Sequence, residues 1–174
     1  MTALSTHCLL PTPIGPLRLA AKSEGLTHLL FGADAPDSPT GDGSPEGARW
    51  LQLAREQLLE YFAGERRAFS ISLAPSGTPF QLEVWSALRD IPYGETSSYA
   101  TLAARIDRPK AVRAVGAANG RNPISIIVPC HRVIGADGSL TGYGGGLKAK
   151  EALLKLEGWR AQRSPNAGQL SLLE

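Results

Sequence analysis

Short apolar segments separated by prolines and glycines open the chain. They are HCLLPT at 7–12, GPLRLAAKS at 15–23 and GLTHLLFG at 25–32. Apolar stretches of this length, bounded by turn residues, are typical of antiparallel strands. We therefore expect a three-stranded meander, followed by an exposed loop over the Asp-, Gly-, Pro- and Ser-rich residues 33–47.

The hydrophobic period then becomes that of a helix. In ARWLQLAREQLLEYFAG, at 48–64, one helical face carries Leu51, Ala54, Leu58 and Phe62. The alternating FSISL at 69–73 predicts a further strand that could join the meander. Residues 1–75 are expected to form a small α+β domain with a structural role, because no pattern typical of catalysis is visible in them.

Residues 76–160 predict a mainly helical domain. Thr78, Pro79 and Gln81 have the types and spacing of a capping box that begins a helix. The remaining expected segments are helices at 97–106 and 111–120, a buried extended stretch at 122–134, a helix at 147–158 and a flexible tail at 161–174. The fold class is therefore α+β, a small N-terminal antiparallel sheet plus a helix, followed by a mainly helical domain with a helix-turn-helix.

The helices at 97–106 and 111–120 fit either a helix-turn-helix or a helical hairpin packed in a core. The second helix is basic and rich in Ala and Gly, so its backbone could approach a bulky partner closely. The candidates for contact with DNA are Lys110, Arg113, Ala114, Gly116, Ala117 and Asn119. An exposed face with charge but little bulk suits a DNA groove, although the pattern alone leaves the hairpin open.

The composition is that of an ordinary globular chain, with 43% hydrophobic and 20% charged residues among 174. No stretch approaches the roughly 18 apolar residues of a membrane span, and the N-terminus does not have the pattern of a secretion signal. A cytoplasmic protein with no membrane partner is expected. The net charge is only +2, yet residues 105–132 hold six Lys and Arg against one Asp. This cluster indicates either contact with a polyanion or a solvated face.

Cys130 and His131 are adjacent in VPCHRVI, at 128–134. The thiol could be core filler, a metal ligand, half of a disulfide or a nucleophile. The other soft ligands are His7, Cys8 and His28, and no CxxC or HxxxH spacing is present. No zinc site is therefore expected, and Cys8 is expected to be a small core residue.

A thiol becomes nucleophilic when a base or a cation favours its ionised form. His131 could be that base if Pro129 kinks the segment, because adjacent residues of a regular strand point to opposite faces. Glu157, near the end of the last helix, could orient the imidazole. These residues by themselves leave both the structural and the catalytic interpretation of Cys130 open.

Five motifs, taken together, favour the catalytic interpretation of Cys130 over the structural one. They are PYGETSSY, RAVGAANGRNP, IIVPCHRVI, GYGGG and LLKLEG, all within residues 78–158. In this order and spacing they resemble the O6-alkylguanine-DNA alkyltransferases (methylated-DNA–protein-cysteine methyltransferases) of the stand-alone bacterial type. The resemblance implies irreversible, single-turnover transfer of the alkyl group of O6-alkylguanine, and of O4-alkylthymine, from duplex DNA to a cysteine. It implies no cofactor, and a monomer when the protein is off DNA.

The resemblance also implies roles for individual residues. Cys130 would attack the alkyl carbon as a partly ionised thiol, while His131 takes its proton through a water and Glu157 holds the imidazole. Tyr99 would turn the DNA phosphate and donate to the purine, and Arg113 would fill the place of the flipped base. The pocket for that base would be formed by Asn122, Val133, Tyr143, Gly144 and Gly145.

The chain departs from the family pattern in three places. Many members carry a serine where Gly144 stands, so this pocket is expected to admit larger alkyl groups. The zinc ligands of some relatives fall at Lys22 and Thr27, which again implies no metal. The C-terminal QLSLL resembles the peptide with which bacterial proteins bind the sliding clamp, here through Gln169, Leu170, Leu172 and Leu173.

Three other functions compete with alkyl transfer. A non-catalytic lesion binder would lack the cysteine, whereas Cys130 is present with His131 and Glu157. A cysteine hydrolase would leave Arg113 and the basic helix unexplained, and a plain DNA-binding module would leave Cys130 unexplained. Alkyl transfer accounts for all of these residues.

Overall fold

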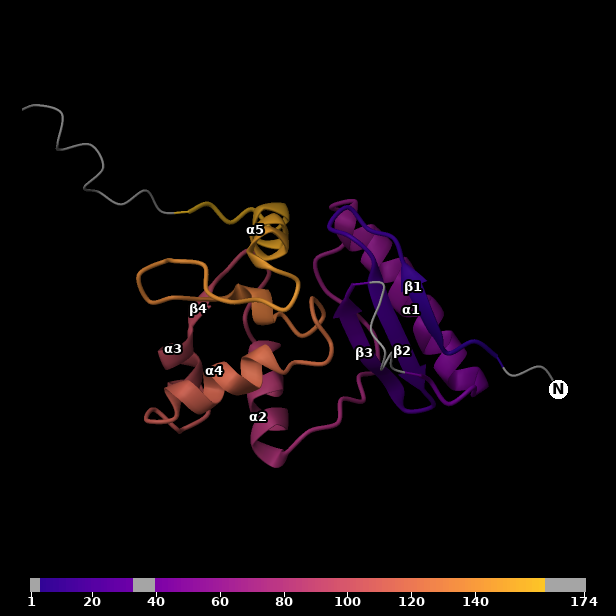
Figure 1. Cartoon of the computed structure of the whole chain (residues 1–174), viewed down its shortest axis with the longest axis horizontal. Coiled ribbons are helices and arrows are strands. Elements are labelled where there is room, and N and C mark those ends of the chain that lie inside the picture. The colour runs from indigo at the N-terminus through magenta and orange to yellow at the C-terminus, as the bar shows by residue number, and fades with distance from the viewer. Residues whose placement is uncertain (1–3, 33–39, 162–174) are drawn as a thin grey trace, which may run out of the picture.

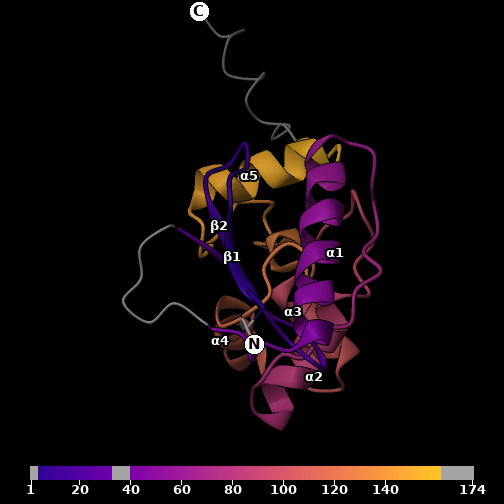
Figure 2. The same ribbon diagram turned by 90° about the vertical axis from the view of Figure 1, so that its right-hand side faces the viewer.

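The N-terminal segments form the predicted antiparallel meander in the computed structural model, which describes residues 4–32 and 40–161. The strands β1 (His7–Leu10), β2 (Leu17–Lys22) and β3 (Gly25–Phe31) pair in the order β1–β2–β3. Helix α1 (Pro45–Phe62) packs against this sheet (Figures 1 and 2). It begins three residues before the predicted helix because Ser44 caps it, accepting a hydrogen bond from the Gly47 backbone N–H at 2.9 Å.

The predicted strand at 69–73 is wrong. This segment forms no strand, and it touches the sheet through a single parallel bridge between Leu73 and Leu26. The Leu26 N–H donates to the carbonyl of Ser72, and the Ala74 N–H donates to the carbonyl of Leu26, both at 2.8 Å. The alternation of apolar residues reflects half-burial along the edge of β3 rather than membership of a ladder.

The C-terminal part is mainly helical, as predicted. Its elements are α2 (Pro79–Leu88), β4 (Ser97–Ser98), α3 (Tyr99–Arg105), α4 (Val112–Gly120), a 3-10 turn (Cys130–Arg132), β5 (Val133–Ile134) and α5 (Leu147–Leu156). The capping box of Thr78 and Gln81 is confirmed, and Ser98 caps α3. The short strands β4 and β5 pair in parallel and tie the start of α3 to the segment after Cys130.

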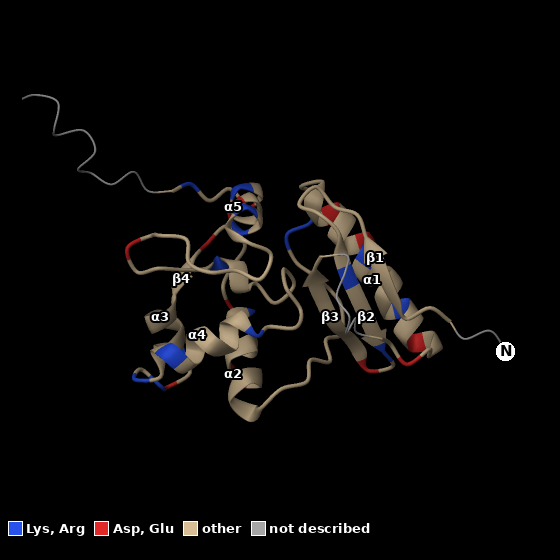
Figure 3. Cartoon of the chain, viewed as in Figure 1, with Lys and Arg blue, Asp and Glu red and all other residues tan. Residues whose placement is uncertain are grey.

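Helices α3 and α4 form the helix-turn-helix, joined by a tight turn over residues 106–111 (Figure 1). Asp107 in this turn has a φ of 58°, a left-handed conformation that reverses the chain. Both helices pack on α2, and their buried side chains are small or aliphatic, among them Leu102, Val115 and Ala118. The basic residues of this turn and of α4 lie close together on the ribbon, in blue at the lower left of Figure 3.

The segment at 122–134 is buried as predicted, but only its last two residues, Val133–Ile134 of β5, are extended. Ile126 has a φ of 71°, and successive turns are closed by hydrogen bonds such as Val128 N–H to the Ile124 carbonyl at 3.0 Å. Only Ile124 makes an isolated bridge, to Leu29 at the free edge of β3. The N-terminal sheet therefore anchors the start of the segment that carries Cys130.

Residues of both halves share one hydrophobic core, which includes Leu26 and Leu58 from the first half and Val84, Cys130 and Leu153 from the second. Within the described part of the chain, no helix has the length and apolar content needed to cross a bilayer. Across the same residues, no three His, Cys, Asp or Glu side chains are grouped to hold a metal ion. The predicted tail and its clamp-binding residues, Gln169 to Leu173, lie outside the described residues.

Candidate active site

Cys130 lies at the start of the 3-10 turn, directly after Pro129. The bend predicted at Pro129 is therefore present, because the chain leaves the preceding turns with φ −82° and ψ 63° at this residue. The cysteine is 5% exposed and lines a cavity of about 190 Å³. The other lining residues are Arg18, Leu30, Phe31, Asn119, Gly120, Asn122, Ser125, Gly142, Tyr143 and Gly144.

His131 and Glu157 form a buried pair, as the sequence suggested. The His131 Nε2 atom lies 2.9 Å from Oε1 of Glu157, and neither side chain is exposed. Burial by itself raises the pKa of Glu157, but hydrogen bonds from His131 and Arg132 outweigh it and hold the pKa at about 2. An ionised carboxylate only accepts, so His131 Nε2 is the donor.

The proton on Nε2 leaves Nδ1 of His131 as the basic nitrogen. This atom is buried and has no hydrogen-bond partner among the described residues. Burial lowers the pKa of His131, and the nearby carboxylate of Glu157 only partly offsets this. The imidazole is therefore neutral at physiological pH, which is the state that a general base requires.

Two residues that hold Glu157 were missed from the sequence, Arg132 and Tyr61. The Arg132 Nε donates to Oε2 of Glu157 and its Nη2 donates to Oε1, each at 2.9 Å. The Tyr61 hydroxyl, from helix α1, donates to the same Oε1 at 2.7 Å. The adjacency of Arg132 to His131 was a signal for the first, whereas nothing local in the sequence marks Tyr61.

Lys150 is a third residue at the site that was not predicted from the sequence. Its Nζ is buried and donates to the carbonyls of Val133 at 2.6 Å and Thr141 at 3.1 Å. Burial raises the pKa of the Cys130 thiol, and hydrogen bonding from Asn122 and the charge of Lys150 lower it in part. The buried ammonium is the cation that a thiolate at this position would need.

Only some of the predicted pocket residues line the cavity. Asn122, Tyr143 and Gly144 line the cavity with Cys130, but Val133 and Gly145 are not among its lining residues. One lone pair of the Val133 carbonyl is already taken by Lys150. Gly145 lies against the ring of Phe31, where an added Cβ would come within 2.7 Å.

The N-terminal half also lines the cavity, which the sequence reasoning did not anticipate. Arg18, Leu30 and Phe31 contribute to it from β2 and β3. The ring of Phe31 packs edge-on against Tyr143, with 5.4 Å between the ring centroids. Two lining residues, Asn119 and Tyr143, carry buried polar atoms without a hydrogen-bond partner in the described structure, Oδ1 and the hydroxyl. Such atoms mark a place where a ligand or water completes the hydrogen bonding.

Asn122 connects α4 to the cysteine-bearing segment. Its Nδ2 donates to the Val128 carbonyl at 2.8 Å, and its Oδ1 accepts from the Ile124 N–H at 3.0 Å. The Asn122 side chain thus closes the loop between the end of α4 and Cys130. A shift of α4 would therefore also move the residues that line the cavity.

Tyr99 begins α3, and its hydroxyl is 2.8 Å from Oγ1 of Thr141 on the loop before Tyr143. Its ring lies beside Gly116 of α4, where an added Cβ would be 3.8 Å from Cδ1.

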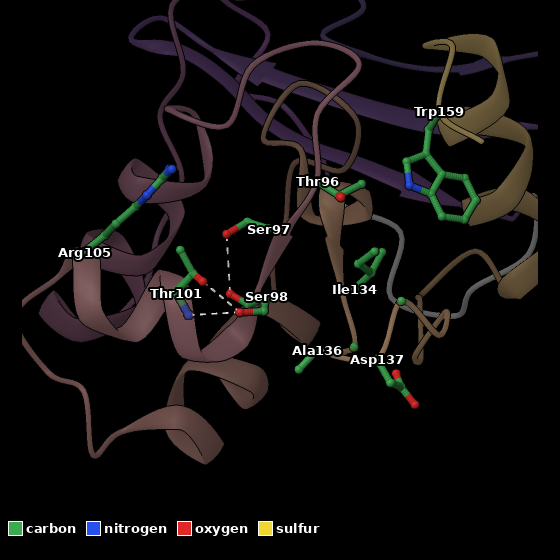
Figure 4. Close-up of a pocket in the computed structure, with 11 residues that line it drawn as sticks. Thr96, Ser97, Ser98, Thr101, Arg105, Ile134, Ala136, Asp137 and Trp159 are labelled. Atoms are coloured by element: carbon green, nitrogen blue, oxygen red, sulfur yellow. Dashed lines mark hydrogen bonds between the residues drawn. The ribbon is translucent and has the colours of Figure 1, made fainter. Parts of the chain in front are cut away.

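A further cavity of about 400 Å³ lies near Tyr99, lined by residues around β4 and β5 and by Trp159 (Figure 4). None of the predicted site residues lines it, and its Ser98 and Thr101 hydroxyls pair with each other at 2.9 Å. The smaller cavity, by contrast, brings Cys130 together with three of the predicted pocket residues, Asn122, Tyr143 and Gly144.

Four of the predicted DNA contacts are exposed at the helix-turn-helix, namely Lys110, Arg113, Ala114 and Ala117, and Gly116 is partly exposed. The expected exposure of Asn119 is wrong. Its side chain is 5% exposed and lines the cavity at Cys130, because it lies in the last turn of α4, which packs against the site.

Two family models match nearly the whole chain. Residues 7–75 match the "6-O-methylguanine DNA methyltransferase, ribonuclease-like domain" and residues 79–159 match the corresponding "DNA binding domain". A methylated-DNA–protein-cysteine methyltransferase of Methanosarcina acetivorans is 53% identical over 152 residues, which are 87% of this chain and 97% of the relative. That of Mycolicibacterium paratuberculosis is 54% identical over 146 residues, 84% and 88% of the two chains.

The fold of the chain is similar to those of solved structures. The OGT of Mycobacterium tuberculosis in complex with DNA superposes with a TM-score of 0.76 at 51% identity, covering 86% of this chain and 90% of that one. The methyltransferase of the archaeon Pyrococcus kodakaraensis shares the fold, with a TM-score of 0.53 at 21% identity over 87% and 98% of the two chains.

A helix-turn-helix beside a buried cysteine, histidine and glutamate defines a DNA-binding protein whose chemistry uses a thiol. Together with the matches above, this places the chain among enzymes that repair DNA by transferring an alkyl group to a cysteine of their own. The chain belongs to the methylated-DNA–protein-cysteine methyltransferase family.

Proposed function

We propose that this chain removes the alkyl group from O6-alkylguanine, and from O4-alkylthymine, in double-stranded DNA and transfers it to Cys130. The observation that supports this most strongly is the buried thiol at a cavity next to the helix-turn-helix, with a neutral histidine and an ionised glutamate behind it. The reaction occurs once per molecule, because a thioether is stable and no group at the site is suited to cleave it. It takes place in the cytoplasm, on DNA, with the protein a monomer off DNA.

The burial of Cys130 requires the damaged base to leave the duplex. Its alkylated oxygen is out of reach within the stack, so the base rotates into the cavity. Helix α4 enters the minor groove, where the small side chains of Ala114, Gly116 and Ala117 allow close approach, and Lys110 binds the backbone. Arg113 fills the place that the base has left.

Transfer is an in-line displacement at the alkyl carbon. The Cys130 sulfur forms the new S–C bond, and the C–O6 bond breaks with its electron pair remaining on the oxygen. The thiol proton passes through a water to Nδ1 of His131, and the Tyr99 hydroxyl supplies a proton to the purine, so that neutral guanine leaves. Tyr99 first exchanges its hydrogen bond to Thr141 for one to the substrate.

The two expected domains divide this work. Residues 76–160 bind the DNA and carry out the transfer, while residues 1–75 support the cysteine-bearing segment and one wall of the cavity. Asn119, Asn122, Tyr143 and Gly144 contact the flipped base. Gly145 acts indirectly, because its close packing on Phe31 fixes the loop that carries Tyr143.

Intact mass spectrometry tests the proposal. The chain is incubated with a duplex containing O6-methylguanine, and we expect one added methyl group per molecule, located on Cys130 by peptide mapping. The Cys130→Ser variant should bind the same duplex and gain no mass. Continuing turnover would instead show a hydrolase or another catalytic cycle, and the absence of any adduct would show a lesion binder or a plain DNA-binding module.

The sliding clamp is a second proposed partner, through Gln169, Leu170, Leu172 and Leu173. Only the resemblance of QLSLL to clamp-binding peptides supports it. Purified clamp should bind the full chain and not a chain that ends at Ala167, and equal binding to both would contradict the proposal.

A further inference from the structure

Tyr61 is a residue of the N-terminal half that reaches into the catalytic pair. It lies in the last turn of α1 and is fully buried. Its ring is held between aromatic neighbours, with centroid distances of 5.4 Å to Phe62, 5.5 Å to Phe69 and 6.3 Å to Tyr93. Its hydroxyl donates at 2.7 Å to Oε1 of Glu157, 96 residues further along the chain.

Oε1 of Glu157 is the oxygen that holds His131. Three donors converge on it, namely the Tyr61 hydroxyl at 2.7 Å, His131 Nε2 at 2.9 Å and Arg132 Nη2 at 2.9 Å. The other oxygen, Oε2, accepts from Arg132 Nε. Arg132 alone would fix the carboxylate along one side, whereas the Tyr61 hydroxyl reaches Oε1 from a different helix.

The Tyr61 hydroxyl is a permanent donor in this position. Burial, and then the negative charge of Glu157, raise the pKa of Tyr61 far above its ordinary value. A phenol that stays protonated beside a carboxylate gives a charge-assisted hydrogen bond, which is stronger than one between neutral groups. The Glu157 oxygen is therefore tied to α1 throughout the physiological pH range.

We propose that Tyr61 is a positioning residue for alkyl transfer, which holds Oε1 of Glu157 against Nε2 of His131 and so keeps the imidazole in place as the base for Cys130. The inference rests on the proposed function, because it concerns the same thiol and the same base. It gives the N-terminal half a part in the chemistry, in addition to its support of the fold.

The test compares Tyr61→Phe with a matched control, Tyr93→Phe. Both variants lose one hydroxyl from the same aromatic cluster, but the Tyr93 hydroxyl donates to the carbonyl of Leu156 at 3.2 Å and not to Glu157. The readouts are the first-order rate of methyl transfer at saturating DNA, the affinity for DNA measured with unmethylated duplex, and the Tm.

We expect Tyr61→Phe to transfer the methyl group about tenfold more slowly at saturating DNA, a part of the roughly 100-fold or more that a general base contributes. DNA affinity should not change, because Tyr61 is fully buried and belongs to α1 rather than to the helix-turn-helix. Tyr93→Phe should keep the full rate, whatever its Tm. A purely structural role would lower the Tm of both variants and leave the rate of the folded fraction unchanged.

A double variant shows whether the effect passes through the carboxylate. In a Glu157→Gln background, adding Tyr61→Phe should slow transfer no further, since the link from the tyrosine to His131 is already broken. Three results would each overturn the inference. Tyr61→Phe could transfer the methyl group as fast as the unmodified chain, or Tyr93→Phe could lose as much of the transfer rate as Tyr61→Phe. In the double variant, the rate reductions caused by Tyr61→Phe and Glu157→Gln could multiply independently. If the unmodified chain gains no methyl group, the proposed function fails instead, so the two failures are distinguishable.

Discussion

Cys130 and His131 are both held in their neutral forms at rest. Burial raises the pKa of the thiol and lowers that of the imidazole. The partly ionised thiol expected from the sequence therefore does not match these surroundings. In the proposed mechanism, a proton moves from sulfur to Nδ1 of His131 as the alkyl carbon arrives, and the nearby charge of Lys150 favours the thiolate at that moment. Keeping the thiol protonated until substrate binds also limits its reaction with other electrophiles.

Lys150→Met should slow alkyl transfer and raise the pKa of Cys130 further. Removing the buried ammonium takes away a favourable charge and leaves the carbonyls of Val133 and Thr141 without its hydrogen bonds. The free energy of unfolding should fall by about 1–3 kcal/mol, the usual cost of unsatisfied buried groups. The pH dependence of alkylation by iodoacetamide measures the thiol pKa directly. Lys148→Met, on the exposed face of the same helix, is the control and should change neither quantity.

At the scale of elements, the glycine loop after Thr141 contains two adjacent glycines in different surroundings. An added Cβ at Gly144 meets nothing within 4 Å, whereas at Gly145 it would lie 2.7 Å from the Phe31 ring. Gly144→Ser should therefore fold normally and, by narrowing the cavity, slow transfer from O6-benzylguanine more than from O6-methylguanine. Gly145→Ala should lower the Tm by displacing Phe31. Equal relative rates for the two substrates in Gly144→Ser would contradict the idea that this glycine admits larger alkyl groups.

Elements whose ends are marked by local chemistry could be predicted from the sequence. The capping box at Thr78 and the Gly- and Pro-bounded strands were found because their causes lie within a few residues. The prediction of extended structure is wrong for 69–73 and for 122–132, because burial on one or both sides produces the same apolar pattern in a turn as in a strand. In the second segment, the side chain of Asn122 replaces the partner strand by bonding Val128 and Ile124.

The candidate site could be predicted where residues are adjacent in the sequence or belong to a motif of the resemblance, such as Asn122, Tyr143 and Gly144. Cys130 and His131 are adjacent, and Glu157 was a candidate from its place near the end of the last helix, with its role implied by the resemblance. Tyr61 and Lys150 could not be found, because their roles depend on how α1 and α5 pack and no spacing in the sequence records that. For the same reason Asn119 was expected on the exposed face of α4, although the last turn of that helix packs against the cavity.

At the scale of the whole molecule, the buried Glu157 network joins the two halves. Helix α1 provides Tyr61, the 3-10 turn provides His131 and Arg132, and the carboxylate follows α5. All of these groups donate hydrogen bonds to Glu157, and these bonds are strongest when its carboxylate is ionised. Protonating this carboxylate should therefore loosen α1 from the C-terminal half as well as disturb the catalytic pair.

Stability should consequently fall as the pH is lowered from about 6.5 towards 2. Below pH 6.5, His131 is protonated more readily in the unfolded chain than in the folded chain, because folding lowers its pKa. The pKa of Glu157 falls from 4.5 to about 2 on folding, so its contribution is complete above pH 4.5 and is lost as the pH approaches 2. That contribution is on the order of 3 kcal/mol. Urea unfolding at a series of pH values measures the slope.

Glu157→Gln separates this contribution from those of other carboxylates. Asp42 also has a pKa of about 2, through hydrogen bonds from Ser44 and Ser23, and it destabilises the fold in the same direction as the pH falls. The variant should be less stable than the unmodified chain at pH 7, and the gap should narrow between pH 4.5 and 2, because glutamine does not titrate. A gap that stays constant over that range would mean that the carboxylate is not the acid-sensitive link between the halves. A gap that narrows would show that Glu157, which accepts the hydrogen bond of His131, also stabilises the contact between the two halves.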